Sequence, residues 1–313
     1  MCGIIGYIGN QAATPLLLDG LRTLEYRGYD SAGVALLTRE DNAQATIETI
    51  KSAGRIGQLE QLLSDRSNDS EILGIGHTRW ATHGPASTTN SHPHSSSDGS
   101  ISVVHNGIIE NYQVIKSFLQ KEGFEFVSET DTEVIPQLIS YHFKKSGDIE
   151  KAFEDTLSQL EGAYAIVMIS THTPDTLFAA KLSSPLLIGL NDKEIFLASD
   201  ASALPQGFNN LIYLEDFEMA IIKDGEPHVT NFKEHVAVEK EPEDLTEFSL
   251  RASKGDFAHY MLKEIHDAPE TIRGATSGRV LLSDKTVKLG GLDSVLNQLE
   301  HIDRIIIVAC GTS

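Results

Sequence analysis

The second residue of this sequence is a cysteine, and its position gives it a particular chemical option. If Met1 is removed, Cys2 carries a thiol and a free α-amine on the same Cα. The thiol can act as a nucleophile. The amine, with an ordinary pKa of about 7.7–8.0 against roughly 8.5 for the thiol, can accept its proton directly or through one water. A small residue at position 2 generally permits removal of the initiator methionine, so we predict an N-terminal nucleophile at Cys2.

Three polar clusters, at residues 77–84, 105–111 and 129–133, hold the other groups that cleavage of an amide needs. The Asn106 side chain and the Gly107 backbone N–H are suitable donors for an oxyanion. Arg79 can hold a substrate carboxylate through two hydrogen bonds, and Asp131 can hold a substrate ammonium group. Together with Cys2, these residues predict hydrolysis of an amide whose substrate carries both charges.

Each of these residues also has a simpler structural explanation. An Asn-Gly pair after a strand is typical of a hairpin turn, and Asp131 could cap a helix. Arg79 beside Trp80 could form a stack on the surface. The amidase interpretation depends on all of these residues acting together with Cys2.

A metal site is an alternative from a different class of function. Zinc binds three or four converging ligands, and four histidines fall within eighteen residues: His77, His83, His92 and His94. We favour structural or pocket-lining histidines, because the segment holds no other good ligand and Pro93 restricts the geometry of its two neighbours. We predict no metal and no cofactor.

The composition argues against several other classes of partner. The formal net charge of −20 argues against nucleic acid and against anionic membrane surfaces. Two cysteines cannot form a disulfide framework, which predicts a reducing, cytoplasmic compartment. No apolar run approaches the roughly 20 residues of a membrane span, and the basic and apolar regions of a signal peptide are absent from the N-terminal residues.

The elements that must position these residues are helices and short strands. Strands are predicted at 4–8, 33–37, 46–50, 72–77 and 101–104, and helices at 14–27, 55–64, 110–122, 130–145 and 148–160. Seven further strands are predicted between residues 163 and 230. Strands at this spacing are typical of antiparallel sheets, so the predicted fold class is α+β, with two sheets face to face and helices outside.

Cap residues define the predicted helix starts, which are Thr14 before Pro15, Thr130–Asp131 and Asp148. The polar segment 82–100 has no predicted element. A structureless segment of that length in a compact domain is usually functional or mobile.

Composition changes near residue 234. The acidic stretch 239–247 is predicted to be a linker, followed by a helix at 256–272 that breaks or ends near Pro269. Four β-branched residues at 305–308, followed by small residues, predict the first buried strand of a parallel α/β domain. Because a lone parallel strand cannot bury itself, we expect the chain to be part of a longer protein.

Several long motifs are similar to those of one family. They are MCGI at 1–4, LEYRGYDSAG at 24–33, HTRWATHG at 77–84, VHNGIIEN at 104–111, SETDTE at 128–133 and HYMLKEI at 259–265. The chain resembles the glutaminase half of the glutamine–fructose-6-phosphate aminotransferase (isomerizing) family, also called glucosamine-6-phosphate synthases. The final ACGTS resembles the start of that family's sugar isomerase domain.

This resemblance implies a domain plan and a reaction. Residues 2–237 would form a four-layer αββα N-terminal-nucleophile hydrolase sandwich, a class II glutamine amidotransferase domain. Residues 238–300 would be a linker with the helix 256–272, and residues 301–313 the truncated start of the isomerase domain. Cys2 would attack the side-chain amide of L-glutamine, form a γ-glutamyl thioester and release ammonia. In the full-length enzyme that ammonia would convert fructose 6-phosphate to glucosamine 6-phosphate.

The resemblance also implies individual roles. Asn106 and Gly107 would form the oxyanion hole. Arg79 would bind the glutamine α-carboxylate and Asp131 its α-amine, in a pocket that Thr82 and His83 also line. Trp80 would gate the route of ammonia, and Thr312 and Ser313 would form part of a sugar-phosphate site. The full-length enzyme is expected to be a homo-oligomer. Two alternatives remain: the glutaminase domain of another class II amidotransferase, or a catalytically idle regulatory domain if Met1 is retained.

Overall fold

The computed structural model describes residues 2–39, 44–64, 71–191, 194–244 and 257–276, together with 280–281, 286–287, 296–299, 301–306 and 308. The chain divides into two compact units, Met1–Leu245 and Thr246–Ser313. All the predicted site residues except Thr312 and Ser313 belong to the first unit, and those two lie outside the described residues.

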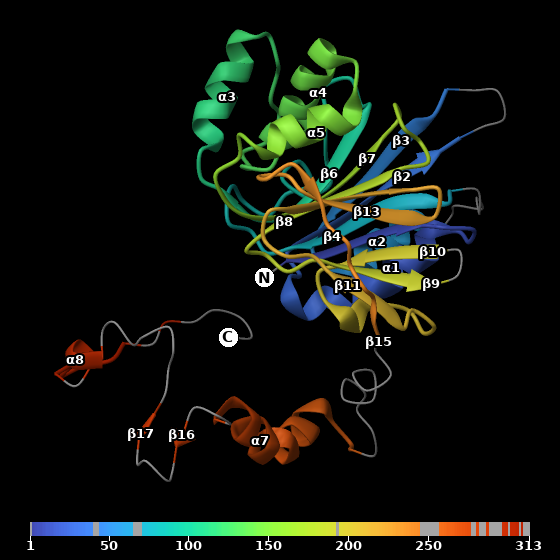
Figure 1. Ribbon diagram of the computed structural model, residues 1–313. Helices are drawn as coiled ribbons and strands as arrows, with labels where there is room; N and C mark the ends of the chain where they lie inside the picture. Colours follow the sequence, from blue (N-terminus) through green and yellow to red (C-terminus); the bar gives the residue numbers. More distant parts are fainter. Residues whose placement is uncertain are drawn as a thin grey trace. The chain divides into compact units, whose positions relative to one another are not determined.

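Two antiparallel sheets form the centre of the first unit (Figure 1). The eight-stranded sheet has the order β15 (Glu243–Asp244), β11 (Asn210–Tyr213), β9 (Leu187–Asn191), β10 (Glu194–Ala198), β1 (Gly3–Ile8), β4 (Leu73–Arg79), β2 (Ser31–Thr38) and β3 (Thr46–Ala53). The seven-stranded sheet has the order β14 (Val236–Ala237), β13 (Glu226–Asn231), β12 (Glu218–Lys223), β8 (Leu177–Leu182), β7 (Gly162–Ser170), β6 (Ile101–Ile109) and β5 (His94–Ser95). Antiparallel sheets were predicted from the hairpin spacing of the strands.

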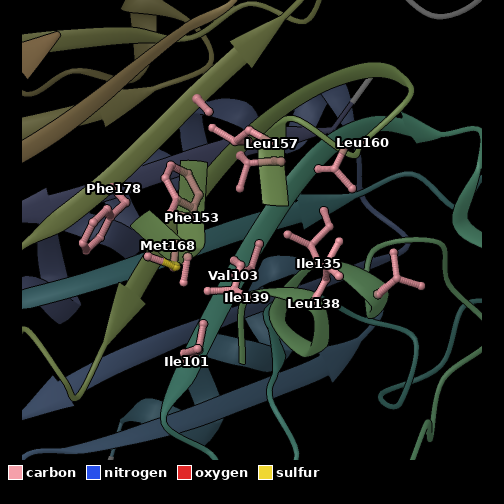
Figure 2. Packing of buried hydrophobic residues seen from close by; sticks show 14 of the residues in the cluster. Ile101, Val103, Ile135, Leu138, Ile139, Phe153, Leu157, Leu160, Met168 and Phe178 are labelled. Carbon is pink, nitrogen blue, oxygen red and sulfur yellow. The ribbon is translucent and has the colours of Figure 1, made fainter. Parts of the chain in front are cut away.

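Helices cover the outer face of each sheet. α1 (Ala13–Leu24) and α2 (Ile56–Leu63) pack on the eight-stranded sheet, and a short 3-10 helix at Glu25–Arg27 follows α1. α3 (Tyr112–Lys121), α4 (Val134–Ser146) and α5 (Ile149–Leu157) pack on the other sheet. Figure 2 shows this second helical layer, where Ile139 and Phe153 meet Val103 and Met168 from the strands. The predicted four-layer αββα sandwich is confirmed.

The alternation of side chains along each strand decides which residues lie between the two sheets. On β4, Ile75 lies in the core between the sheets, so His77, two residues further, points the same way. On β6, Val104 lies in that core, and Asn106 follows at the same spacing. The two sheets therefore direct His77 and Asn106 toward each other from their inner faces.

The predicted start of α1 is wrong by two residues. The helix begins at Ala13, after Ala12, and not at Pro15 after a Thr14 cap. The N–H of Ala13 donates to the backbone oxygen of Glu71 at 2.7 Å, so a neighbouring backbone carbonyl takes the place of a side-chain cap. Pro15 lies in the first turn, where its missing N–H costs no helical hydrogen bond.

The start of α4 also differs from the prediction, whereas that of α5 agrees with it. α4 begins at Val134, and its N-terminal neighbour Glu133 makes no side-chain cap. Asp148 caps α5 by accepting a hydrogen bond from the N–H of Lys151 at 3.1 Å. Asp131 is therefore available for a role other than capping.

The segment 82–100 is more structured than predicted. It contains the short strand β5, which pairs with β6, and residues 90–94 are buried. Lys51 on β3 donates from Nζ to the backbone oxygen of Ser91 at 2.9 Å. These contacts fasten the segment to both sheets.

The predicted linker 239–247 contains residues that belong to the sandwich. Glu243 and Asp244 form β15, which pairs with β11 and so covers an edge of that strand that would otherwise be open. Lys240 Nζ lies 2.9 Å from Glu218 Oε1. The first compact unit, Met1–Leu245, thus continues beyond residue 237. The domain boundary at residue 237 stays a prediction.

The second unit contains α7 (Tyr260–Thr276), the strand pair β16 (Val280–Leu281) and β17 (Thr286–Val287), and α8 (Leu296–Leu299). α7 takes the place of the predicted helix 256–272. It continues through Pro269 instead of ending there, since a proline removes only one helical hydrogen bond and the adjacent turns keep theirs. Ile305, Ile306 and Val308 form no strand, and a β-branched segment needs a neighbouring strand to pair with. None of the described helices has the length and apolar character to cross a membrane.

Candidate active site

Cys2 lies immediately before β1 and beside the end of β4. The two strands pair with Gly3 opposite Thr78, so the chain that leaves β4 passes next to Cys2. The N–H of Trp80 donates to Cys2 Sγ at 3.2 Å, and Sγ lies 3.5 Å from the backbone oxygen of Trp80. A Cβ on Gly3 would come within 2.6 Å of Leu24 Cβ, so glycine permits this close approach.

The surroundings of Cys2 keep its sulfur protonated at neutral pH. Burial raises the pKa of the thiol, whereas the Trp80 N–H and, to a lesser degree, the charge of Arg79 favour the thiolate. A thiol in this state needs a base before it can attack a carbonyl carbon.

Asn106 lies inside β6 and makes two side-chain hydrogen bonds. Nδ2 donates to the backbone oxygen of Cys2 at 3.1 Å, and Oδ1 lies 3.0 Å from His77 Nε2. The residue pairs with Ala165 of β7, and the strand continues to Ile109. The Asn106-Gly107 pair is therefore not a hairpin turn.

Gly107 has a backbone conformation that requires glycine. Its φ of +123° lies in the region that side chains disfavour, and a Cβ would come within 1.9 Å of the backbone oxygen of Ala163. Asn106 is buried, whereas Gly107 is exposed. The strand thus reaches the surface at Gly107, directly after the buried Asn106.

Arg79 is buried and directed toward the segment that follows it. Its side chain donates to the backbone oxygen of His83 and lies 3.5 Å from that of Pro85. The residue is only 3% exposed, which excludes a surface stack with Trp80. Trp80 is instead half-exposed and makes an edge contact with Tyr29 at 5.2 Å between ring centroids.

Asp131 connects the third polar cluster to the end of β6. Oδ2 accepts a hydrogen bond from the N–H of Ile109 at 2.8 Å, and Oδ1 lies 3.6 Å from His83 Nδ1. Thr82 Oγ1 lies 3.3 Å from the same nitrogen. The partner of Asp131 is thus a strand residue and not a helix terminus, so the helix-cap explanation is wrong. The structure brings Asp131, His83 and Thr82 together.

Four buried histidines, at positions 77, 92, 94 and 105, link β4 and β6 with the segments 82–100 and 129–133. The rings of His77 and His92 stack at 4.2 Å, and those of His92 and His94 meet at 5.0 Å. His94 Nε2 lies 3.0 Å from Thr130 Oγ1, and His105 Nδ1 lies 2.9 Å from Thr132 Oγ1. Burial lowers the pKa of all four histidines, to about 3 for His77.

The histidines do not converge as a metal site would require. His83 lies with Asp131, away from the stacked pair of His77 and His92. Across the described part of the chain, no three His, Cys, Asp or Glu residues are placed to hold a metal ion.

The structure adds two residues that sequence reasoning missed. The Asp30 carboxylate accepts hydrogen bonds from the N–H of Ala81 and, at 2.8 Å, from Ser31 Oγ. Asn90 Nδ2 donates to the backbone oxygen of Pro85 at 3.1 Å, and its Oδ1 accepts from the N–H of Glu129 at 3.0 Å. Asp30 belongs to the motif at 24–33, to whose residues the sequence assigned no role. Asn90 lies in the polar segment 82–100, where the sequence did not single it out.

Comparison with known proteins shows which proteins this chain resembles. A family model described as "Glutamine amidotransferase domain" matches residues 77–206. The whole chain is 46% identical to glutamine–fructose-6-phosphate aminotransferase [isomerizing] of Clostridium tetani and 44% identical to that of Chlorobaculum tepidum. The chain spans about half the length of these relatives, 50% in both cases.

Solved structures show the same architecture. Glutamine phosphoribosylpyrophosphate amidotransferase of B. subtilis is 28% identical, with a TM-score of 0.61 over 74% of this chain and 49% of that one. A glutamine aminotransferase class-II domain protein from Silicibacter pomeroyi has the same fold at 15% identity, with a TM-score of 0.51 over 74% of this chain and 99% of that one. The chain contains a glutamine amidotransferase domain, has the N-terminal-nucleophile hydrolase fold, and is similar along its whole length to about half of a glutamine–fructose-6-phosphate aminotransferase.

Proposed function

We propose that this chain hydrolyses L-glutamine to glutamate and ammonia, with Cys2 as the nucleophile. The observation that carries the proposal is the meeting of Cys2 Sγ with the Trp80 N–H at 3.2 Å and of the Cys2 backbone with Asn106 Nδ2 at 3.1 Å. A sulfur nucleophile and a neutral amide donor at one strand end are the parts that acyl transfer from an amide needs.

The reaction begins with the α-amine that removal of Met1 would free. This amine takes the proton of the Cys2 thiol, and the sulfur attacks the side-chain amide carbon of glutamine. The negative oxygen that forms accepts hydrogen bonds from Asn106 Nδ2 and from the Gly107 N–H. The protonated amine then gives its proton to the leaving nitrogen, and ammonia departs from a γ-glutamyl thioester. Water hydrolyses the thioester, which restores the thiol and yields glutamate.

Arg79, Asp131, His83 and Thr82 would bind the two charged ends of glutamine. Arg79 has five N–H donors, and its bonds to two backbone oxygens leave others for the α-carboxylate of glutamine. Asp131 Oδ1 is available to the α-ammonium group beside His83. Thr82 is exposed next to His83 and would line the entrance.

In a longer protein, the ammonia would serve a sugar substrate. The relatives act, by name, on glutamine and fructose 6-phosphate, and this chain matches about half of each. We infer that a further part of the protein receives the ammonia and converts fructose 6-phosphate to glucosamine 6-phosphate. Half-exposed Trp80 would gate the route, Thr312 and Ser313 would begin the sugar-phosphate site, and the protein would be a cytoplasmic homo-oligomer.

The test is release of glutamate by the purified chain at millimolar glutamine. Intact mass first establishes whether Met1 has been removed, because an acylated α-amine cannot serve as the base. We expect activity in the processed protein, and a Cys2→Ala variant that binds glutamine without turnover. Processed protein that releases no glutamate would disprove the proposal, and activity retained in Cys2→Ala would exclude this nucleophile.

A further inference from the structure

The oxyanion donor Asn106 has a second partner, which the reaction described above leaves without a role. His77 Nε2 lies 3.0 Å from Asn106 Oδ1, and both residues are buried. We propose that His77 is a positioning residue, which holds the Asn106 carboxamide in the one orientation that directs its N–H donors to Cys2. This inference rests on the proposed glutaminase reaction.

A carboxamide can rotate so that its oxygen and nitrogen exchange places, and only one orientation suits Asn106. With Nδ2 toward Cys2, the amide donates to the Cys2 backbone oxygen at 3.1 Å and keeps its second N–H for the oxyanion. With the amide reversed, Oδ1 would face the Cys2 oxygen, and two lone pairs would oppose each other. The reversed amide would also present a lone pair where the reaction develops negative charge.

The protonation state of His77 favours this orientation. Burial lowers the pKa of His77 to about 3, so the ring is neutral near pH 7 and carries one proton. A proton on Nε2 donates to Asn106 Oδ1, whereas a proton on Nδ1 would lie on a buried nitrogen that has no hydrogen-bond partner of good geometry among the described residues. The tautomer with the Nε2 proton and the productive amide orientation therefore support each other.

The surroundings hold the His77 ring in place. His77 is fully buried, and its ring stacks on His92 at 4.2 Å with a 28° angle between the planes. His77 lies on β4 and Asn106 on β6, which belong to different sheets. The hydrogen bond thus joins the sheet of the nucleophile to the sheet of the oxyanion donor.

Two substitutions separate the hydrogen bond from the volume of the side chain. His77→Leu removes the donor, and we expect kcat to fall by about 10–100-fold, less than or equal to the usual loss for an oxyanion donor itself, while KM for glutamine stays within about twofold. His77→Gln places an amide N–H near the position of Nε2, and we expect it to recover most of kcat. His94→Leu is the matched control: a similarly buried histidine that bonds to Thr130 instead, whose kcat should stay within about twofold.

A double-mutant cycle provides the readout that a merely structural role would not change. In an Asn106→Ala background, His77→Leu should cause no further loss of kcat, because the side chain that it positions is absent. The rate at which iodoacetamide alkylates Cys2 should be the same in the wild-type protein and in His77→Leu, because the thiol and its base are unchanged. An equal fold-loss of kcat in both backgrounds, or an unchanged kcat in folded His77→Leu, would overturn the inference.

The remaining outcomes are also decisive. If His77→Leu does not fold, His77→Asn replaces it, because its shorter amide keeps the polarity but does not reach Asn106. Turnover by His77→Asn equal to that by His77→Gln would then overturn the inference, whereas a kcat lower by about tenfold or more would support it. A wild-type protein without glutaminase activity would instead refute the proposed function, which is a distinguishable result.

Discussion

At the scale of single residues, Asp131 makes two contacts that one substitution can separate. Asp131→Asn keeps an oxygen for the N–H of Ile109 but loses the negative charge beside His83. Since the charge would bind the ammonium group in the ground and transition states alike, we expect KM for glutamine to rise about 10–100-fold at nearly constant kcat. Steady-state kinetics measure both values. Asp175→Asn, at an exposed ion pair, is the control, and a pure kcat effect in Asp131→Asn would contradict the role.

Gly107 permits a second test at this scale. Gly107→Ala should lower kcat by about 100-fold or more, because relief of the 1.9 Å contact with the Ala163 backbone oxygen must move the N–H that we propose as an oxyanion donor. Gly123→Ala is matched, since Gly123 also has a positive φ, +89°, but no described atom within 4 Å of the added Cβ. That control should lose about 1 kcal/mol of folding stability and no activity. Equal kcat values for the two variants, with both folded, would remove Gly107 from the oxyanion hole.

Several site residues could be predicted from sequence because their chemical types are specific. Cys2, Asn106 and Asp131 fall in motifs whose groups suit an amidase, and the structure brings Asn106 to the Cys2 backbone and Asp131 to the end of β6. The contacts of Asn90 could not be predicted, since its partners lie 5 and 39 positions away and are backbone atoms. Backbone groups carry no signature of side-chain type, so sequence does not reveal which of them a side chain will meet.

At the scale of elements, the segment 82–100 holds Arg79 in place. Its backbone oxygens at His83 and Pro85 accept hydrogen bonds from Arg79, and Asn90 fastens Pro85 to Glu129. The lack of a predicted element here does not mean a lack of order. Hydrogen bonds from side chains order the first part of the segment, and β5 adds regular structure only at His94–Ser95.

Removal of the Asn90 side chain tests this view of the segment. Asn90→Ala loses one donor and one acceptor, each worth about 1 kcal/mol, so we expect KM for glutamine to rise about 3–10-fold and amide exchange in residues 83–91 to speed up. Thr88→Ala, at an exposed position of the same segment, is the control and should change neither quantity. Faster exchange without a change in KM would separate the segment's order from glutamine binding.

At the scale of the whole molecule, alternating strands and hairpin spacing predicted the layers but not the order of strands. β1 lies between β10 and β4 in the middle of its sheet, although it comes first in the sequence. Strand order depends on long-range packing, to which local patterns contribute little. The consequence of this order is a polar cluster between strands β4 and β6, at the end of a core that is otherwise apolar.

This buried cluster predicts how the stability of the molecule depends on pH. Burial lowers the pKa values of His77, His92, His94 and His105, to about 3 for His77, from an ordinary value near 6.5. The unfolded chain therefore binds protons below about pH 6.5 that the folded chain refuses, and each histidine can remove up to about 1.4 kcal/mol of stability per pH unit between its unfolded and folded pKa values. We expect the free energy of unfolding of the first unit, measured by urea titration, to be at its maximum above pH 7 and to fall steeply from pH 6 to pH 4.5. His94→Gln should make this slope shallower, because one proton fewer is taken up on unfolding, and a stability that stays flat from pH 7 to pH 4.5 would show that the cluster accepts protons without opening.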